Sequence, residues 1–221
     1  MRKIVAFTLP MALFISLLGL AGAIRKPGAA LWLSAPEQWI YPAQTLLCGA
    51  AVFWFWRDFE FRLPRKAWFA LLIGIVVWVV WIAPQQFLGF EPRTIGFDPE
   101  IFGKGSASYG AILFGRFLRL VIVAPLVEEI FWRGFLLRYL IRENFTDVAV
   151  GTFSWFSFLV VAVAFGFTHS RADWIPAMIC GALYNLVAYR TRSLASCVLA
   201  HATTNLLLGL WIMQTRQWGF W

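Results

Sequence analysis

The sequence predicts an all-α fold, a polytopic transmembrane bundle of seven or eight helices. Hydrophobic residues make up 61% of the 221 residues and charged residues only 14%, whereas a soluble domain carries about 25% charged residues. The mean hydropathy is +0.72. The apolar residues form continuous runs, as in membrane helices, and not the short alternating segments of a membrane barrel. We therefore expect a multi-pass integral membrane protein.

Eight apolar runs are the candidate helices. They span residues 4–23, 39–56, 67–83, 108–124, 126–141, 148–167, 174–189 and 194–213. The first run is about 20 residues long, which matches a full span better than the shorter core of a signal peptide, so we expect it to be retained. We expect one integrated domain, with N-terminal helices and a polar loop in residues 1–107 and a helical core in residues 108–221.

Pro125 separates two of these runs. A continuous helix over residues 108–142 would be about 52 Å long at about 1.5 Å per residue, against an apolar bilayer core of about 30 Å. The chain therefore either kinks at Pro125 and leaves the membrane, or folds back there.

The charge balance fits a membrane surface. The 19 Lys and Arg residues outnumber the 11 Asp and Glu residues, which gives a net charge of +8. The basic residues lie between apolar runs, for example in 57–66 and 190–192, where cytoplasmic loops and anionic lipid headgroups favour them. This pattern indicates contact with the lipid bilayer and excludes nucleic acid as a partner.

Two adjacent carboxylates, Glu128 and Glu129, interrupt an apolar run. A charge at bilayer depth costs at least about 2.5 kcal/mol, so it is normally paired or functional. Arg133 stands four residues after Glu129, the favourable spacing for an ion pair on a helix. Glu128 is rotated by about 100° and has no such partner, which leaves it available for chemistry. A purely structural salt-bridge cluster with Arg133, Arg119 or Arg116 is the alternative.

The only two histidines of the chain, His169 and His201, lie at the end of one apolar run and inside another. Asn205 follows His201 by one helical turn, on the same face. Taken singly, these side chains could cap a helix or bond two helices together. Together with an unpaired carboxylate, they are the groups needed to activate water and to stabilise an oxyanion.

Three short motifs in the C-terminal half resemble those of the CPBP family, the CAAX proteases and bacteriocin-processing proteins also called Abi proteins, which include the type II CAAX prenyl proteases. The motifs are Glu128-Glu129-x-x-x-Arg133, Phe165-x-x-x-His169 and His201-x-x-x-Asn205. They cover residues 108–213, about half of the chain. The resemblance implies an intramembrane endopeptidase of eight or so helices with its site in a cavity partway into the bilayer.

The resemblance also implies a role for each motif residue. Glu128 and His169 would activate the attacking water, and His201 with Asn205 would stabilise the oxyanion. The supporting residues would be Glu129, Arg133 and Phe165.

The protease classes with other signatures do not fit. Neither histidine is followed by Glu, which excludes an HExxH zinc protease. No Gly-x-Ser-Gly segment occurs, and the four aspartates lie in expected loops or at helix ends. Zinc held by Glu128, His169 and His201 is still possible, but we favour a mechanism with no obligatory metal.

The predicted substrate is a membrane-anchored or membrane-associated protein or peptide, and the expected location is the bacterial inner membrane. One alternative is a non-catalytic scaffold or chaperone of the same superfamily. Another is a small transporter, which inverted repeats would indicate and which the sequence does not show. If residues 148–167 form a full span, His169 lies at a membrane face. Glu128 must then lie near that face too, which favours a break or sharp kink at Pro125.

Overall fold

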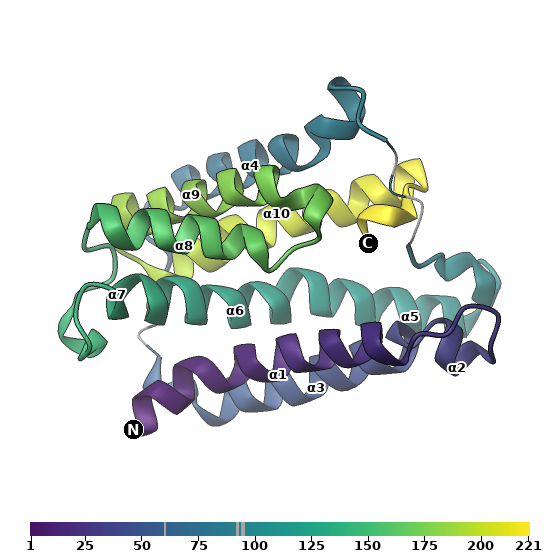
Figure 1. Ribbon diagram of the computed structural model, residues 1–221, viewed down its shortest axis with the longest axis horizontal. Coiled ribbons are helices and arrows are strands. Elements are labelled where there is room, and N and C mark those ends of the chain that lie inside the picture. The colour runs from purple at the N-terminus through teal and green to yellow at the C-terminus, as the bar shows by residue number, and fades with distance from the viewer. Residues whose placement is uncertain (60, 92, 94–95) are drawn as a thin grey trace.

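The computed structural model describes residues 1–59, 61–91, 93 and 96–221. These residues form helices, turns and loops without any strand, so the predicted all-α bundle is confirmed (Figure 1). The α-helices are α1 (Arg2–Ile24), α2 (Leu31–Ser34), α3 (Glu37–Trp54), α4 (Ala67–Phe87), α5 (Ala107–Phe117), α6 (Ala124–Glu129), α7 (Leu137–Tyr139), α8 (Trp155–Phe167), α9 (Trp174–Thr191) and α10 (Leu194–Thr215).

The helices have the length and surface of membrane spans. Among the described residues, four helical runs are long and apolar enough to cross a bilayer: Arg2–Ile24, Ala67–Phe87, Ala107–Tyr139 and Leu194–Thr215. Large apolar side chains such as Leu46, Phe53 and Phe114 are exposed on the outside of the bundle, where lipid would solvate them. The chain is an integral membrane protein.

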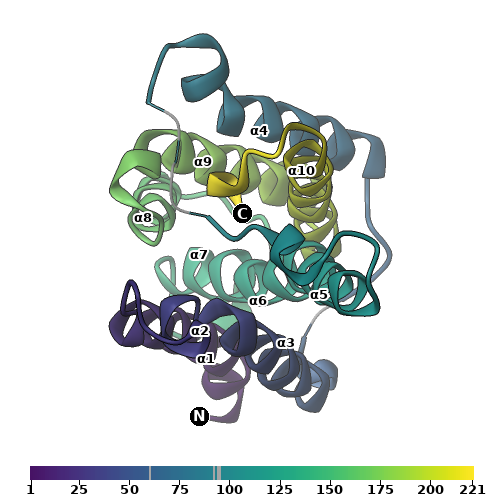
Figure 2. The same ribbon diagram turned by 90° about the vertical axis from the view of Figure 1, so that its right-hand side faces the viewer.

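A single long helical run lies at the centre of the molecule. It comprises α5, α6 and α7, joined by the π-helical segments Leu118–Val123 and Ile130–Leu136. Figures 1 and 2 show this central helix between one layer formed by α1 and α3 and a second layer formed by α4, α8, α9 and α10. Of the predicted paths at Pro125, a break and a fold-back are therefore wrong, because the helix continues through this residue.

The π-helical register explains why Pro125 is tolerated. The backbone N–H of Ala124 bonds to the carbonyl of Arg119, five residues earlier. In the same register the next N–H would bond to the Leu120 carbonyl, but proline has no N–H to donate. Asn205 of α10 fills this gap, since its Nδ2 donates to the Leu120 carbonyl oxygen at 2.8 Å. A side chain from another helix thus replaces the missing backbone donor.

Helix α8 is shorter than the predicted run 148–167, because it begins only at Trp155. The preceding loop is held by the buried Arg138, whose Nε donates to the Val148 carbonyl at 2.6 Å. Thirteen helical residues cover about 20 Å, less than the apolar core of a bilayer. His169 therefore does not have to lie at a membrane face, and the argument for a break at Pro125 loses its premise.

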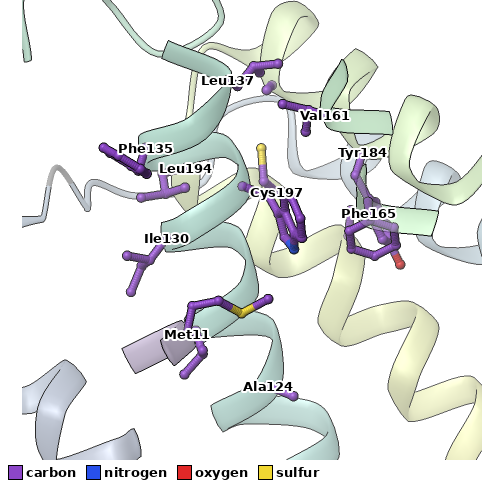
Figure 3. Packing of buried hydrophobic residues seen from close by; sticks show 14 of the residues in the cluster. Met11, Ala124, Ile130, Phe135, Leu137, Val161, Phe165, Tyr184, Leu194 and Cys197 are labelled. Atoms are coloured by element: carbon purple, nitrogen blue, oxygen red, sulfur yellow. The ribbon is translucent and has the colours of Figure 1, made fainter. Parts of the chain in front are cut away.

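Tight packing fixes α10, the helix that carries His201, against its neighbours. A Cβ atom on Gly74 of α4 would lie 2.6 Å from the Ala200 carbonyl oxygen, so only glycine allows this approach. Ile130 of the central helix, Phe165 of α8 and Cys197 of α10 belong to one cluster of buried apolar residues (Figure 3). The position of His201 is thus set by a close-packed framework.

Candidate active site

The predicted catalytic side chains surround one cavity of about 220 Å³. Its walls come from α1, α4, the central helix, α8, α9 and α10. The four candidates that line it are Glu128, His169, His201 and Asn205. Residues up to 77 positions apart in the sequence, from three separate helical regions, are therefore brought to one place.

A fully buried ion pair lies behind this cavity. Arg133 Nη1 donates to Glu129 Oε1 at 3.0 Å, as the spacing of the two residues predicted, and both side chains are 0% exposed. The guanidinium also donates from Nε to Asn185 Oδ1 at 3.1 Å and from Nη2 to the Gly181 carbonyl at 2.9 Å. The ion pair thereby joins the central helix to α9.

The same carboxylate orients His201. Glu129 Oε1 lies 2.8 Å from His201 Nδ1. A carboxylate bound to Arg133 accepts hydrogen bonds, so we assign the proton of this contact to Nδ1. The imidazole also stacks on the ring of Tyr184, with the centroids 4.9 Å apart and an interplanar angle of 21°. Nε2 is the ring nitrogen that remains for a ligand in the cavity.

Glu128 differs from its neighbour in every respect that matters for chemistry. It is half-buried and lines the cavity. It forms no hydrogen bond and no ion pair of its side chain with any residue that the structure describes. Glu129, in contrast, does not line the cavity, and its Oε1 is held by a guanidinium and an imidazole, while its buried Oε2 has no hydrogen-bond partner among the described residues. Glu128 is therefore the carboxylate that can accept a proton from a ligand.

His169 is held immediately after the end of α8. Its backbone N–H bonds to the Gly166 carbonyl at 3.1 Å, and its Nδ1 lies 2.9 Å from the Phe165 carbonyl oxygen. Because a carbonyl only accepts, Nδ1 carries the hydrogen, and Nε2 of the neutral ring carries a lone pair. The edge of Trp81 contacts the ring, with centroids 5.3 Å apart. This tautomer is the one in which the outward nitrogen can accept a proton.

Phe165 supports both histidines. Besides its carbonyl contact, its ring lies 4.9 Å from the centroid of His169 and 6.4 Å from that of His201. It also lies under the guanidinium of Arg133, at 5.1 Å. The phenylalanine of the second motif thus packs against both imidazoles and against the buried ion pair.

Asn205 lines the cavity and also bonds to the backbone of the central helix. One hydrogen of its Nδ2 is used by the Leu120 carbonyl, which leaves the second hydrogen of the amide for a ligand. If Asn205 stabilises an oxyanion, it must do so with its side-chain amide held against the Leu120 carbonyl.

We expect the substitution Asn205→Leu to lower the free energy of unfolding by about 1–3 kcal/mol, because it leaves the Leu120 carbonyl without its donor inside the bundle. In a Pro125→Ala background the restored backbone N–H can bond to that carbonyl, so the same substitution should cost clearly less. Unfolding of all four proteins in detergent micelles measures the difference. Equal costs in the two backgrounds would contradict our account of the π-helical register.

Arg119 is a cavity residue that the sequence did not assign to the site. In a regular α-helix, positions 119 and 128 are nine residues apart and lie on opposite faces. The π-helical segment adds one residue to a turn, so that Arg119 bonds to Ala124 and joins the row of Ala124 and Glu128. Pro125 was the available signal, since proline and π-bulges often occur together at helix distortions. Arg119 forms no ion pair with either glutamate in the part of the chain described.

The donor set does not fit a zinc site. Zinc would need three protein ligands converging on one point, with a fourth position open for water. Across the described residues, no three His, Cys, Asp or Glu side chains lie close enough together to hold a metal ion. The chemistry proposed below uses protein side chains alone.

Comparison with known proteins agrees with these motifs. Residues 110–207 match the family model described as Type II CAAX prenyl endopeptidase Rce1-like. No curated protein and no solved structure matched the chain. The matched segment runs from α5 to α10 and contains every motif residue of the cavity. Residues 110–207, which carry Glu128, His169, His201 and Asn205 to the cavity, are similar to the CAAX protease-like family.

Proposed function

We propose that this protein is an intramembrane endopeptidase of the bacterial inner membrane, which hydrolyses a peptide bond of a membrane-associated protein. The observation that carries the proposal is the meeting of Glu128, His169 and His201 at one cavity. In that cavity the Glu128 side chain forms no hydrogen bond or ion pair with a described residue, while Oε1 of Glu129 is held by Arg133 and His201. One unengaged carboxylate beside two oriented imidazoles is the arrangement that general acid–base chemistry needs.

The first step is the attack of water on the scissile carbonyl carbon. A water molecule between Glu128 and His169 would donate one proton to the Glu128 carboxylate as its oxygen forms the new bond to carbon. Nε2 of His169 would accept a hydrogen bond from the same water and orient it. The Phe165 carbonyl supports this role, since it keeps the hydrogen of His169 on Nδ1.

The second step requires donors for the oxyanion. His201 in its protonated form would donate from Nε2, while the Glu129 carboxylate holds Nδ1 and so orients the ring. The second amide hydrogen of Asn205 would donate from the same helix, one turn away. Glu128 would then return its proton to the leaving nitrogen as the carbon–nitrogen bond breaks. Donors placed for the charge that develops in the transition state are usually the largest catalytic contribution.

The decisive experiment is cleavage of a library of membrane-anchored reporter proteins in liposomes by the purified protein and its Glu128→Gln variant. We expect Glu128→Gln to lower cleavage by about 10²–10⁴-fold, the usual contribution of a general base. Its thermal melting should stay close to that of the unaltered protein, because Glu128 forms no hydrogen bond with described residues. The matched control is Glu143→Gln, the same substitution at an exposed glutamate outside the cavity. This variant should cleave the reporters at the normal rate.

The same experiment tests the rival function, a non-catalytic scaffold. On that reading, the buried contacts of Glu129 and Arg133 serve only to hold helices or a partner together. Absence of cleavage by the unaltered protein, together with loss of folding in Glu128→Gln, would favour the scaffold.

A further inference from the structure

The catalytic cavity contains a cation that the proposed reaction does not use. Arg119 lines the cavity together with Glu128. Arg119 nevertheless has no carboxylate within ion-pair distance in the described chain. A charged side chain at bilayer depth is costly and usually serves a function. The contacts of Arg119 show which atoms of its guanidinium are still available to bind a ligand.

The guanidinium is held in place on three sides. Nε of Arg119 donates to Gln44 Oε1 at 2.5 Å, and Gln44 is itself fixed, because its Nε2 donates to the Phe14 carbonyl at 2.7 Å. The rings of Tyr41 and Phe14 lie 4.0 and 5.1 Å from the guanidinium carbon. Gln44 is completely buried. Helices α1 and α3 therefore orient this group before any ligand arrives.

The two terminal amino groups of Arg119 are what remains. Neither hydrogen-bonds to a described residue, and neither belongs to the unpaired atoms that are sealed inside the protein. Since the side chain lines the cavity, we infer that these amino groups face it. Two parallel N–H groups on a planar, oriented guanidinium match the two oxygens of a carboxylate.

Arg116, one turn earlier, provides the contrast. It lines a different cavity, of about 140 Å³, between α3 and α5. Its guanidinium lies 4.0 Å from the ring of Phe97 and 4.9 Å from that of Tyr41. The π-helical segment begins only after this turn, so Arg119 alone of the two is turned toward Glu128. Two arginines of one helix thus offer a matched pair for experiment.

We propose that Arg119 binds a carboxylate of the substrate inside the catalytic cavity and is a specificity-determining residue. The ligand is an apolar peptide with a carboxylate, supplied by its C-terminus or by an acidic side chain. The apolar walls from α1 and α4 suit the rest of such a peptide. This inference rests on the proposed peptidase function for the identity of the ligand, but binding can be tested without turnover.

The test compares three dansyl peptides by fluorescence anisotropy with the Glu128→Gln protein in dodecylmaltoside micelles. The probes are dansyl-Ala-Leu-Phe-Leu as the free acid, the same peptide as its C-terminal amide, and dansyl-Ala-Leu-Phe-Glu amide. We expect the free acid to bind at least about tenfold more tightly than its amide, since a bidentate charged hydrogen bond is lost in the amide. Tight binding of the glutamate amide would identify an acidic side chain as an equally good source of the carboxylate.

Substitutions of Arg119 and Arg116 then show which arginine causes the preference for the free acid. Arg119→Gln should bind acid and amide alike, Arg119→Lys should keep part of the preference, and Arg116→Gln should keep all of it. Equal affinities for the three probes in the protein with both arginines intact would overturn the proposal, and this comparison does not depend on the folding of any arginine variant. Persistence of the acid preference in Arg119→Gln would overturn it too. A clear preference for the free acid without any reporter cleavage would contradict the proposed peptidase function but would support carboxylate binding by Arg119.

Discussion

Replacing either Glu128 or His169 by glutamine is expected to lower the rate of reporter cleavage by about 10²–10⁴-fold, and replacing both should lower it little further. The physical reason is that the two side chains serve one step, the activation of a single water molecule. Once either is gone, the other has no correctly placed water to act on. Steady-state kcat for the four proteins on one cleaved reporter gives the coupling between the two sites.

The comparison of the single and double variants is valid only if each variant folds normally. Glutamine at position 169 keeps an amide donor that can reach the Phe165 carbonyl, so the turn after α8 should survive. Thermal melting in micelles checks this, with Glu143→Gln as the neutral reference. If the double variant lost activity by the product of the two single losses, Glu128 and His169 would act in separate steps, and the shared-water mechanism would be wrong.

The sequence was sufficient for the fold class and for the contacts along one helix. Continuous apolar runs with few charges allow only helices that satisfy their own backbone in a bilayer. Likewise, the spacing of Glu129 and Arg133 predicted an ion pair that the structure contains at 3.0 Å. Both predictions depend on periodicity within a single segment, and no knowledge of the neighbouring helices was needed.

Features that depend on a second helix could not be predicted. The continuous helix through Pro125 is stabilised by Asn205, 80 residues later, which donates to the Leu120 carbonyl. The sequence around Pro125 does not predict this hydrogen bond. The same π-helical segment moves Arg119 into the cavity. The start of α8 is similar, because residues 148–154 are as apolar as a helix but are held as a loop by Arg138. Tertiary hydrogen bonds contributed to each case, and at α8 the Ser154 N-cap and the positive φ of Gly151 also mark the later start.

Replacing Arg133 by methionine is expected to lower the free energy of unfolding by about 3–5 kcal/mol, the usual cost of breaking a buried ion pair from one side. The substitution removes three donors, to Glu129, Asn185 and the Gly181 carbonyl. It leaves the Glu129 carboxylate completely buried, with only the His201 contact. Chemical unfolding in micelles measures the loss, and Arg142→Met, at an exposed position nine residues later, is the control.

A second substitution separates charge from packing. Glu129→Gln added to Arg133→Met removes the uncompensated carboxylate, so the double variant should regain part of the lost stability. It should still not cleave, because the neutral glutamine no longer places a carboxylate against Nδ1 of His201. A double variant less stable than Arg133→Met would show that the carboxylate is not the source of the strain. Recovery of cleavage together with stability would show that His201 does not need the charge of Glu129, and the oxyanion step would have to be assigned to other donors.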